Sequence, residues 1–208
     1  MPDYKFYYFE VRGVGEPARM AFHYGGIPFE DIRVPQQEWP DLKKKMPQGT
    51  VPCLFIDNGK IKLSQSSAIA LYIGRKVGLA GRTELEMARV EEAIATYKDL
   101  YTKMADYCYT MTGFKDMDKD ELYEKQAKPV SAQYFTLLSK MLKKHHNTFV
   151  ASQKPTVADF FFAEYLSSVN GFAPELFKGH EGLLDYVKRV HSIPQLQDYL
   201  KKRPKTAW

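Results

Sequence analysis

The chain has 208 residues, 44% of them apolar and 26% charged, which is the balance of an ordinary globular protein with a sizeable core, in one large domain or two small ones. Its net charge of +5 is spread as an excess of three cations in residues 1–76 and two in the rest, too thinly for the clustered basic face of a nucleic-acid-binding protein. No stretch approaches the ~20 apolar residues that a membrane-spanning helix needs.

The cysteines and the N-terminal stretch indicate where the protein works. Cys53 and Cys108 are too few for a disulfide framework, and neither lies in a CxxC motif. The five histidines show no metal-ligand spacing with acids or cysteines, so no metal site is expected. The opening MPDYKFYYFEVRG is charged and mixed, unlike a secretory signal. We therefore expect a cytoplasmic protein in a reducing compartment, with no membrane or nucleic-acid partner.

Residues 4–34 predict a β-α-β unit. Residues 4–11 are aromatic and β-branched, which favours a strand. A helix follows in residues 12–26, with Pro17 near its start and two glycines after its end. Residues 29–34 alternate in polarity and predict a second strand, parallel to the first with a right-handed crossover. Residues 35–47, between two prolines, predict a loop or a broken helix.

The next segment predicts a β-β-α unit. Residues 51–57 form a third strand, an Asn-Gly hairpin turn follows, and KLS returns as a short fourth strand. Residues 64–78 then predict a helix with a serine cap. The order β-α-β-β-β-α is that of a thioredoxin-like domain, which we assign to residues 1–76.

Pro52 stands at the start of the third strand, where a proline cannot donate to the sheet. Thioredoxin-like domains carry a cis proline at this point, and a cis Val51–Pro52 bond would leave the backbone of Val51 free to pair with an extended peptide. Position alone leaves the cis form and a trans proline on an edge strand both open. The neighbouring Cys53 lies inside an apolar strand and is interpreted as a buried structural thiol.

Beyond a glycine-containing linker at residues 77–83, residues 84–208 predict an all-helical domain. A long helix begins in residues 84–111, and further helices are expected at 119–145, 156–169, 180–191 and 194–202. One face of the long helix carries apolar residues at spacings of three or four: Val90, Ile94, Tyr97, Tyr101, Met104 and Cys108. Thr156 and Asp159 form a capping-box pattern.

Four stretches together make the chain resemble the cytosolic glutathione S-transferases, and within them the sigma-like class: YKFYYFEVRGVGEPARMAF, EWPDLKKKMPQGTVPCL, LSQSSAIALYI and PTVADFFFAE. The resemblance covers essentially the whole chain. It implies the α/β thioredoxin-like domain plus all-α domain of that family, and conjugation of reduced glutathione to hydrophobic electrophiles. Glutathione would be a co-substrate, with no tightly bound cofactor, and the protein would be a homodimer.

The resemblance also implies roles for individual residues. Tyr8 would be the catalytic hydroxyl that donates a hydrogen bond to the glutathione sulfur and favours its thiolate. The resemblance also favours the cis form of the Val51–Pro52 bond over the trans form. The glutathione-binding residues would be Tyr8, Trp39, Lys43, Gln48, Val51, Pro52, Gln65, Ser66 and Asp99. Asp99 would reach the glutathione of the neighbouring subunit, and the start of the helix at Ser66 would hold a carboxylate.

A pocket for the hydrophobic substrate would lie between the domains, lined by Val11, Gly13, Val14, Tyr101, Phe161, Tyr165 and Trp208. For Phe161 and Tyr165, burial in the helical core is an equal alternative. The prostaglandin D synthases of the family have an arginine where this chain has Val14 and a lysine where it has Thr50, which argues against efficient prostaglandin synthesis.

Two other functions stay open on the sequence. A non-catalytic carrier of apolar ligands such as haem or lipids, or a crystallin-like structural relative, would use the same helical domain. The intact glutathione residues and the absence of an insertion in the helical part favour the enzyme. A glutathione-dependent isomerase or peroxidase would share the same site.

Overall fold

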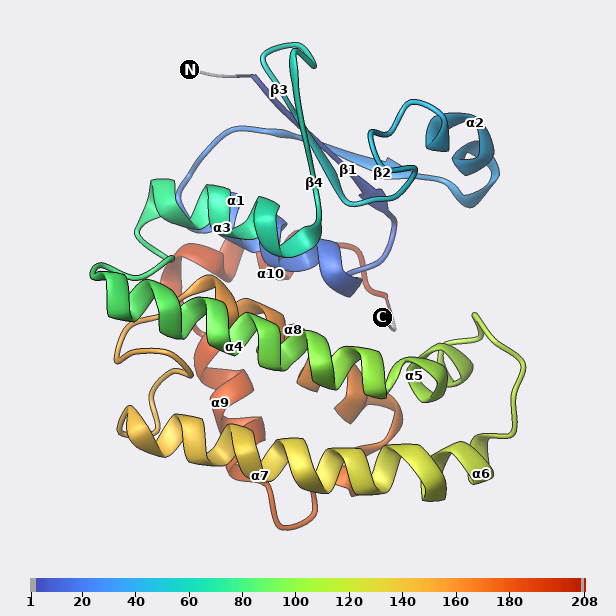
Figure 1. Cartoon of the computed structure of the whole chain (residues 1–208), viewed down its shortest axis with the longest axis vertical. Helices are drawn as coiled ribbons and strands as arrows, with labels where there is room; N and C mark the ends of the chain where they lie inside the picture. The colour runs from blue at the N-terminus through green and yellow to red at the C-terminus, as the bar shows by residue number, and fades with distance from the viewer. Residues whose placement is uncertain (1–2, 207) are drawn as a thin grey trace.

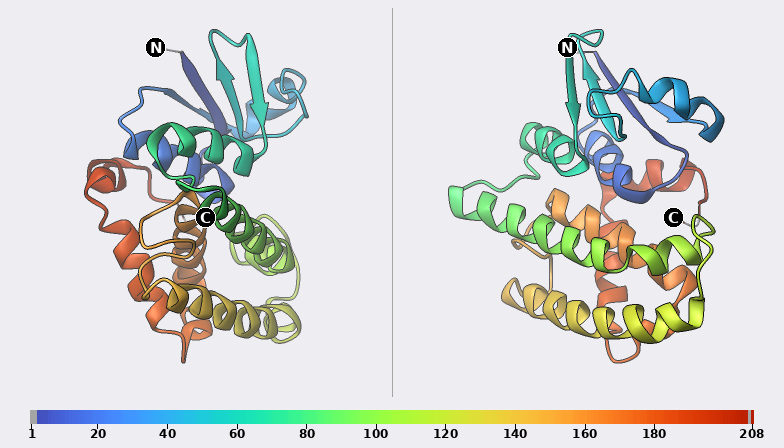
Figure 2. Two further views of the ribbon diagram at one scale, coloured as in Figure 1. Left: turned by 60° about the vertical axis from the view of Figure 1, so that its left-hand side comes forward. Right: turned by 45° about the vertical axis from the view of Figure 1, so that its right-hand side comes forward.

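The computed structural model describes residues 3–206 and 208, and its two parts are stacked one above the other (Figure 1). The upper part holds a four-stranded sheet with helices, and the lower part is helical. This confirms the predicted combination of a thioredoxin-like α/β part and an all-α part. Figure 2 shows the same stacking from two further directions. Within the described ranges, none of the helices combines the length and the apolar character needed to cross a bilayer.

The upper part follows the predicted β-α-β-β-β-α order. Its elements are β1 (Tyr4–Phe9), α1 (Glu16–Tyr24), β2 (Glu30–Val34), a short α2 (Trp39–Lys43), β3 (Cys53–Ile56), β4 (Ile61–Ser64) and α3 (Ser66–Val77). The strand order is β2-β1-β3-β4, with β1 parallel to β2 and antiparallel to β3, and β3 antiparallel to β4. The hairpin turn has positive φ at both Asn58 and Gly59, as the Asn-Gly pair predicts.

Both strands that border the candidate site are shorter than predicted. β1 ends at Phe9 rather than at residue 11, because the carbonyls of Phe9 and Val11 accept hydrogen bonds from the Arg19 guanidinium at 3.2 and 2.8 Å. β3 begins at Cys53, opposite Tyr7 and Ser64, one residue after the proline. The residues that follow Phe9 and those that precede Cys53 are therefore outside the regular hydrogen-bond ladder of the sheet.

The lower part comprises seven α-helices in the described chain: α4 (Glu84–Lys103), α5 (Ala105–Met111), α6 (Lys119–Leu122), α7 (Lys128–Lys144), α8 (Val157–Phe172), α9 (Gly182–His191) and α10 (Gln197–Lys202). The predicted apolar face of the first long helix is confirmed: Val90, Ile94, Tyr97, Met104 and Cys108 are buried and Tyr101 is half-buried. The capping box of Thr156 and Asp159 at the start of α8 is also present.

Two predicted helices are interrupted. The helix expected at 84–111 breaks at Met104, which ends α4 and begins α5. The helix expected at 119–145 contains a π-helical turn at Tyr123–Ala127, in which Lys128 N–H bonds to the carbonyl of Tyr123. Pro129 follows at once and has no N–H to continue a regular ladder. Apolar periodicity continues across both interruptions, so it did not reveal them.

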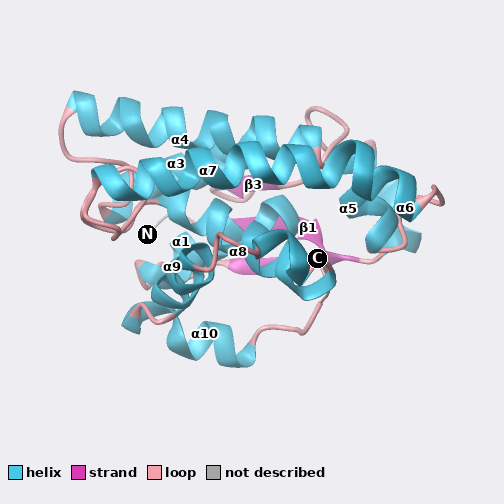
Figure 3. Cartoon of the chain, turned by 90° about the horizontal axis from the view of Figure 1, so that it is seen from below, coloured by secondary structure: helices cyan, strands magenta, loops and turns pink. Residues whose placement is uncertain are grey.

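Helix α8 forms the centre of the helical part and is buried along most of its length. It packs against α4 and α9, and α1 and α3 of the upper part lie on it from above. Seen from below, α4 and α7 run alongside each other and the sheet lies behind the helical layer (Figure 3). The turn after the C-terminal end of β1 meets the segment after α10 at the boundary between the two parts, where Arg12 N–H bonds to the carbonyl of Trp208. The candidate site lies there.

Candidate active site

Tyr8 lies near the end of β1 and its side chain is almost fully buried, with 6% exposed. The alternation of the strand turns Tyr4, Phe6 and Tyr8 to the same buried face. The phenol oxygen of Tyr8 accepts a hydrogen bond from Val14 N–H at 3.2 Å. Burial raises the pKa of Tyr8 to about 12, although the Val14 bond and the charge of Arg19 act in the opposite direction. At neutral pH Tyr8 is therefore a neutral phenol that keeps its proton to donate.

Gly13 and Gly15 wrap closely around the Tyr8 side chain. A Cβ atom on Gly13 would lie 2.6 Å from the Tyr8 Oη, and Gly13 has a φ of +40°. A Cβ on Gly15 would lie 2.3 Å from Cδ1 of the ring. Only glycine leaves room for the ring at these positions, so the turn before α1 holds the hydroxyl in place. Gly13 is thus placed against the hydroxyl rather than in the wall of the large cavity described below.

The Val51–Pro52 peptide bond is cis, as predicted. Val51 lines the same cavity as Tyr8, from the segment just before β3. Cys53 is fully buried, its Sγ lies 3.7 Å from Ser64 Oγ, and burial raises its pKa. A thiol in that environment is a poor nucleophile, in agreement with its structural interpretation.

Gln48 and Gln65, far apart in the sequence, are brought together: Gln65 Nε2 donates to Gln48 Oε1 at 2.7 Å. Gln65 has the rare φ of +76° for a residue that is not glycine, a conformation that costs energy and is often found at binding sites. The serine cap predicted for α3 is wrong, because Gln65 is the N-cap residue and Ser66 the first helical residue. The Gln65 side chain makes no cap hydrogen bond to α3, which leaves the first N–H groups of this helix to an anion.

Trp39 and Lys43 lie on the short helix α2. The Trp39 ring contacts Phe9 edge to face, with centroids 5.3 Å apart. Lys43 is exposed, and the carbon atoms of its side chain lie near Gly49. Asp99 is exposed on α4 and does not belong to the lining of the cavity beside Tyr8. In this single chain it therefore stands apart from the other predicted glutathione residues.

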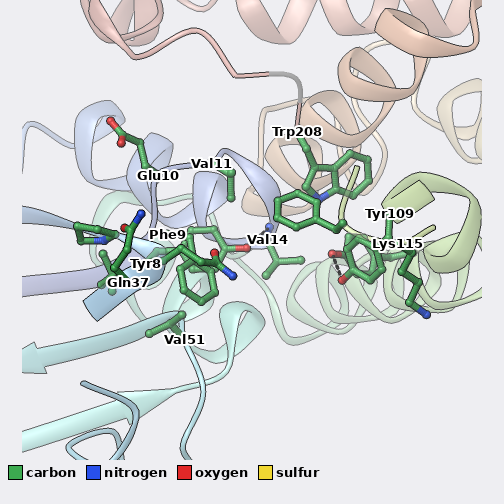
Figure 4. Close-up of a pocket in the computed structure, with 15 residues that line it drawn as sticks. Tyr8, Phe9, Glu10, Val11, Val14, Gln37, Val51, Tyr109, Lys115 and Trp208 are labelled. Atoms are coloured by element: carbon green, nitrogen blue, oxygen red, sulfur yellow. Dashed lines mark hydrogen bonds between the residues drawn. The ribbon is translucent and has the colours of Figure 1, made fainter. Parts of the chain in front are cut away.

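A cavity of about 740 Å³ opens beside Tyr8 at the boundary of the two parts (Figure 4). Its lining includes Val11, Val14, Tyr101 and Trp208 of the predicted hydrophobic pocket. The sequence reasoning missed the other lining residues, which are Phe9, Glu10, Val34, Pro35, Gln36, Gln37, Tyr109, Phe114 and Lys115. Tyr109 had a detectable signal, since it follows Tyr101 at eight residues, about two helical turns, and their hydroxyls are 2.9 Å apart.

Phe161 and Tyr165 do not line this cavity. Phe161 is 1% exposed and packs against Tyr97 with ring centroids 4.9 Å apart, so it is a core residue. Tyr165 lies behind Trp208, with ring centroids 5.9 Å apart. Tyr165, Gly13 and Trp208 border a separate void of about 10 Å³. Tyr165 therefore supports the Trp208 wall of the cavity from behind, and Phe161 belongs to the helical core.

Comparisons with known proteins agree with this geometry. The family model of the glutathione S-transferase N-terminal domain matches residues 15–76, and that of the C-terminal domain matches residues 98–203. Glutathione S-transferase 1 of Ascaris suum is 36% identical over 208 residues, which is all of both chains. Human hematopoietic prostaglandin D synthase is 30% identical, with 99% of each chain covered.

A solved structure also matches along its whole length. It is the crystal structure of monomeric Na-GST-3, a glutathione S-transferase of the hookworm Necator americanus. It superposes with a TM-score of 0.92 at 32% identity, covering 99% of this chain and all of that one. With both domain models matched and a full-length relative at this level of identity, the chain belongs to the glutathione S-transferase family.

Proposed function

We propose that the protein conjugates reduced glutathione to hydrophobic electrophiles, with Tyr8 as the residue that stabilises the thiolate. One observation carries the proposal: a buried, neutral Tyr8 accepts from Val14 N–H and lines a large cavity. A free thiol has a pKa near ~8.5. A hydroxyl that bonds the anion better than the thiol lowers that pKa and increases the nucleophilic fraction at neutral pH.

Glutathione would lie across the C-terminal end of β1 and the N-terminal end of β3, towards α3. The backbone of Val51 beside cis Pro52 would pair with the cysteinyl unit as an added strand does. Gln65, Ser66 and the uncapped start of α3 would hold the γ-glutamyl carboxylate. Trp39, Lys43 and Gln48 would bind the glycine end, with the exposed Lys43 ammonium facing its carboxylate.

The electrophile would occupy the cavity between Tyr8 and Trp208, where apolar and aromatic side chains predominate. Prostaglandin D synthesis is a weaker candidate. Arg12 is the arginine nearest to Val14 in the sequence. Its side chain is ion-paired to Glu164 at 3.1 Å and does not line the cavity. Storage of apolar ligands, haem or lipids among them, is compatible with the volume of about 740 Å³ and with catalysis at the same site.

For the assembly we propose a sigma-class homodimer in the cytoplasm, in which exposed Asp99 on α4 reaches the glutathione of the partner subunit. Residues 1–76 would form the glutathione-binding domain, 77–83 the linker and 84–208 the domain that shapes substrate specificity. Sedimentation of the purified chain tests the dimer. Because the hookworm relative is described as monomeric, a monomer with full activity and an unaffected Asp99→Asn variant would exclude this role of Asp99.

The central test compares Tyr8→Phe with Tyr7→Phe. Tyr7 is the matched control, because it lies on the same strand but faces the other side of the sheet. Its ring packs on that of Phe55, with centroids 4.7 Å apart. A hydrogen bond to a charged group contributes about 1.5–3 kcal/mol. Its loss should raise the thiol pKa by about one to two units and cut kcat with an aryl halide roughly 10- to 100-fold at neutral pH.

The binding affinity for glutathione should change little in Tyr8→Phe, and Tyr7→Phe should behave as the wild type. The thiolate absorbance of bound glutathione as a function of pH measures the pKa directly. If Tyr8→Phe kept wild-type kcat and thiol pKa, the role of Tyr8 would be wrong. If the wild type bound apolar ligands in competition with the aryl halide but formed no conjugate, the carrier function would replace the enzyme.

A further inference from the structure

Glu164 is a buried carboxylate at the boundary of the two parts, and it has no place in the proposed chemistry. It lies on α8 with its side chain 3% exposed. Its Oε2 accepts from Arg12 Nη1 at 3.1 Å and from Arg203 Nη1 at 2.9 Å, and its Oε1 is 2.8 Å from His191 Nε2. A charge so deeply buried is tolerated only when it is paired, and here three groups from distant parts of the chain pair with it.

Two of these partners hold the segment that carries Trp208. Arg203 follows directly after α10, at the start of that segment. Arg12 donates from its side chain to the carbonyl of Thr206 at 3.3 Å, and from its backbone N–H to the carbonyl of Trp208 at 2.8 Å. The hydroxyl of Thr206 donates to the same Trp208 carbonyl at 2.9 Å. The position of Trp208 thus depends on two arginines that converge on Glu164.

The same network reaches the turn beside the catalytic tyrosine. Arg203 also pairs with the buried carboxylate of Glu16 on α1 at 2.8 Å, and Tyr199 donates to that carboxylate at 2.7 Å. Glu16 pairs with the fully buried Arg19, which binds the backbone at the end of β1. The Trp208 segment is therefore tied to both parts of the molecule by buried charges.

The indole of Trp208 is where this network meets the cavity. Its side chain is mostly buried and contacts Tyr101, Tyr165 and Phe172, with ring centroids 5.9, 5.9 and 6.2 Å apart. In Figure 4 it faces Val14 across the cavity lined by Tyr8. Residues 203–206 have no helix or strand of their own, so the polar anchors place the indole.

We propose that Glu164 is a positioning residue for the electrophile: together with Arg12 and Arg203 it holds residues 203–206 and Trp208 so that Trp208 forms one wall of the cavity. It thereby sets the affinity for bulky apolar electrophiles without touching glutathione. This inference rests on the proposed function for its kinetic consequence, but the placement of Trp208 is independent of turnover.

The first test is Glu164→Gln, which keeps the shape of the side chain but removes the charge that both arginines share. We expect KM for a bulky aryl halide to rise at least fivefold, while KM for glutathione stays within twofold. Arg203→Gln should have the same effect, and Arg203→Lys, which keeps a charge, should restore part of the affinity. Lys202→Gln is the matched control, because Lys202 is the exposed neighbour of Arg203 on α10.

The second measurement needs no conjugation. The chain has two tryptophans, so in a Trp39→Phe background the fluorescence reports Trp208 alone. Glu164→Gln and Arg203→Gln should shift that emission to the red and increase its quenching by acrylamide, whereas Lys202→Gln should not. If the wild type conjugated nothing, the proposed function would fail, and quenching would still decide the positioning role.

Unchanged Trp208 quenching in a folded Glu164→Gln variant would overturn the inference. So would a fall in kcat with both KM values unchanged, since that pattern is not a loss of the cavity wall. Where Glu164→Gln does not fold, Arg203→Gln decides by the same criteria, because Arg203 is partly exposed and its removal leaves Glu164 paired with Arg12 and His191.

Discussion

Replacing Gly15 by alanine adds a single methyl group behind the ring of Tyr8, the proposed catalytic residue. The backbone of Gly15 has φ −85° and ψ −24°, which alanine adopts without strain, so the substitution tests space alone. The new Cβ would lie 2.3 Å from Cδ1, 2.6 Å from Cγ and 2.8 Å from Cε1 of Tyr8. These are atoms of a rigid buried ring, which cannot yield as the end of a flexible side chain does.

The size of the effect follows from these distances. Carbon atoms in contact are about 3.5–4.0 Å apart, so the ring or the turn must move by more than about 1 Å. Overpacking of this kind costs about 1–3 kcal/mol of stability. A displacement of about 1 Å in a catalytic group can cost roughly 100-fold in rate. We therefore expect Gly15→Ala to fold, to bind glutathione nearly as well, and to lose most of its kcat.

The assay combines steady-state kinetics, the pKa of bound glutathione and the melting temperature. Gly171→Ala is the matched control, because a Cβ there meets nothing within 4 Å and the residue lies in α8. It should leave kcat unchanged and stabilise the protein by up to about 1 kcal/mol. Wild-type kcat and thiol pKa in Gly15→Ala would refute the reasoning that the turn before α1 fixes the Tyr8 hydroxyl.

Three further predictions concern buried groups. Asp159→Ala removes an acceptor of four hydrogen bonds, from Val150 N–H, Thr156 N–H and hydroxyl, and the Tyr186 hydroxyl. At about 1–3 kcal/mol for each unsatisfied buried donor, denaturant titration should show a loss of at least about 3 kcal/mol, and a smaller loss in Asp159→Asn. Burial alone raises the pKa of Glu164, but the His191 hydrogen bond and the charges of Arg203 and Arg12 lower it from 4.5 to about 2. Its contribution to stability is therefore complete above about pH 4.5 and lost as the pH falls towards 2, and the melting temperature of Glu164→Gln should fall less over that window. Burial raises the pKa of Cys53, and that of Cys108 to about 12, so both thiols should react with iodoacetamide only after unfolding; rapid labelling of the native protein would contradict their burial.

The local features of the glutathione side were readable from the sequence because they depend on neighbouring residues. The resemblance singled out Tyr8, which lies on the buried face of β1, and it favoured the cis form at Pro52 that position alone left open. The serine cap of α3 was a local prediction that failed, since the backbone of Gln65 takes the capping position with positive φ. A positive φ at a residue other than glycine has no signal in composition, and the side-chain partner of Gln65, Gln48, lies 17 residues away in the sequence.

The electrophile side was predicted less completely, because it depends on residues that meet only in the folded chain. The ion pair of Arg12 with Glu164 joins positions 152 residues apart. Periodicity continued the long helix through Met104, where the structure ends α4 and begins α5, the helix that carries the lining residue Tyr109. Phe161 and Tyr165 have the residue types of a pocket wall. Only their packing shows that Phe161 lies in the core and Tyr165 behind Trp208.

The two sides of the site differ in what a substitution disturbs. The proposed sulfur activation would rest on β1 and the glycine turn, where one added methyl group would displace the Tyr8 ring. The proposed electrophile binding would rest on α4, α5 and Trp208, whose lining side chains can change without moving Tyr8. Arg12 connects the two, because it lies in the turn after β1 and binds the carbonyls of Thr206 and Trp208. Substitutions of the lining residues Tyr101, Tyr109 and Trp208 should therefore change electrophile selectivity alone, whereas a change at Arg12 should affect the electrophile and the thiol pKa together.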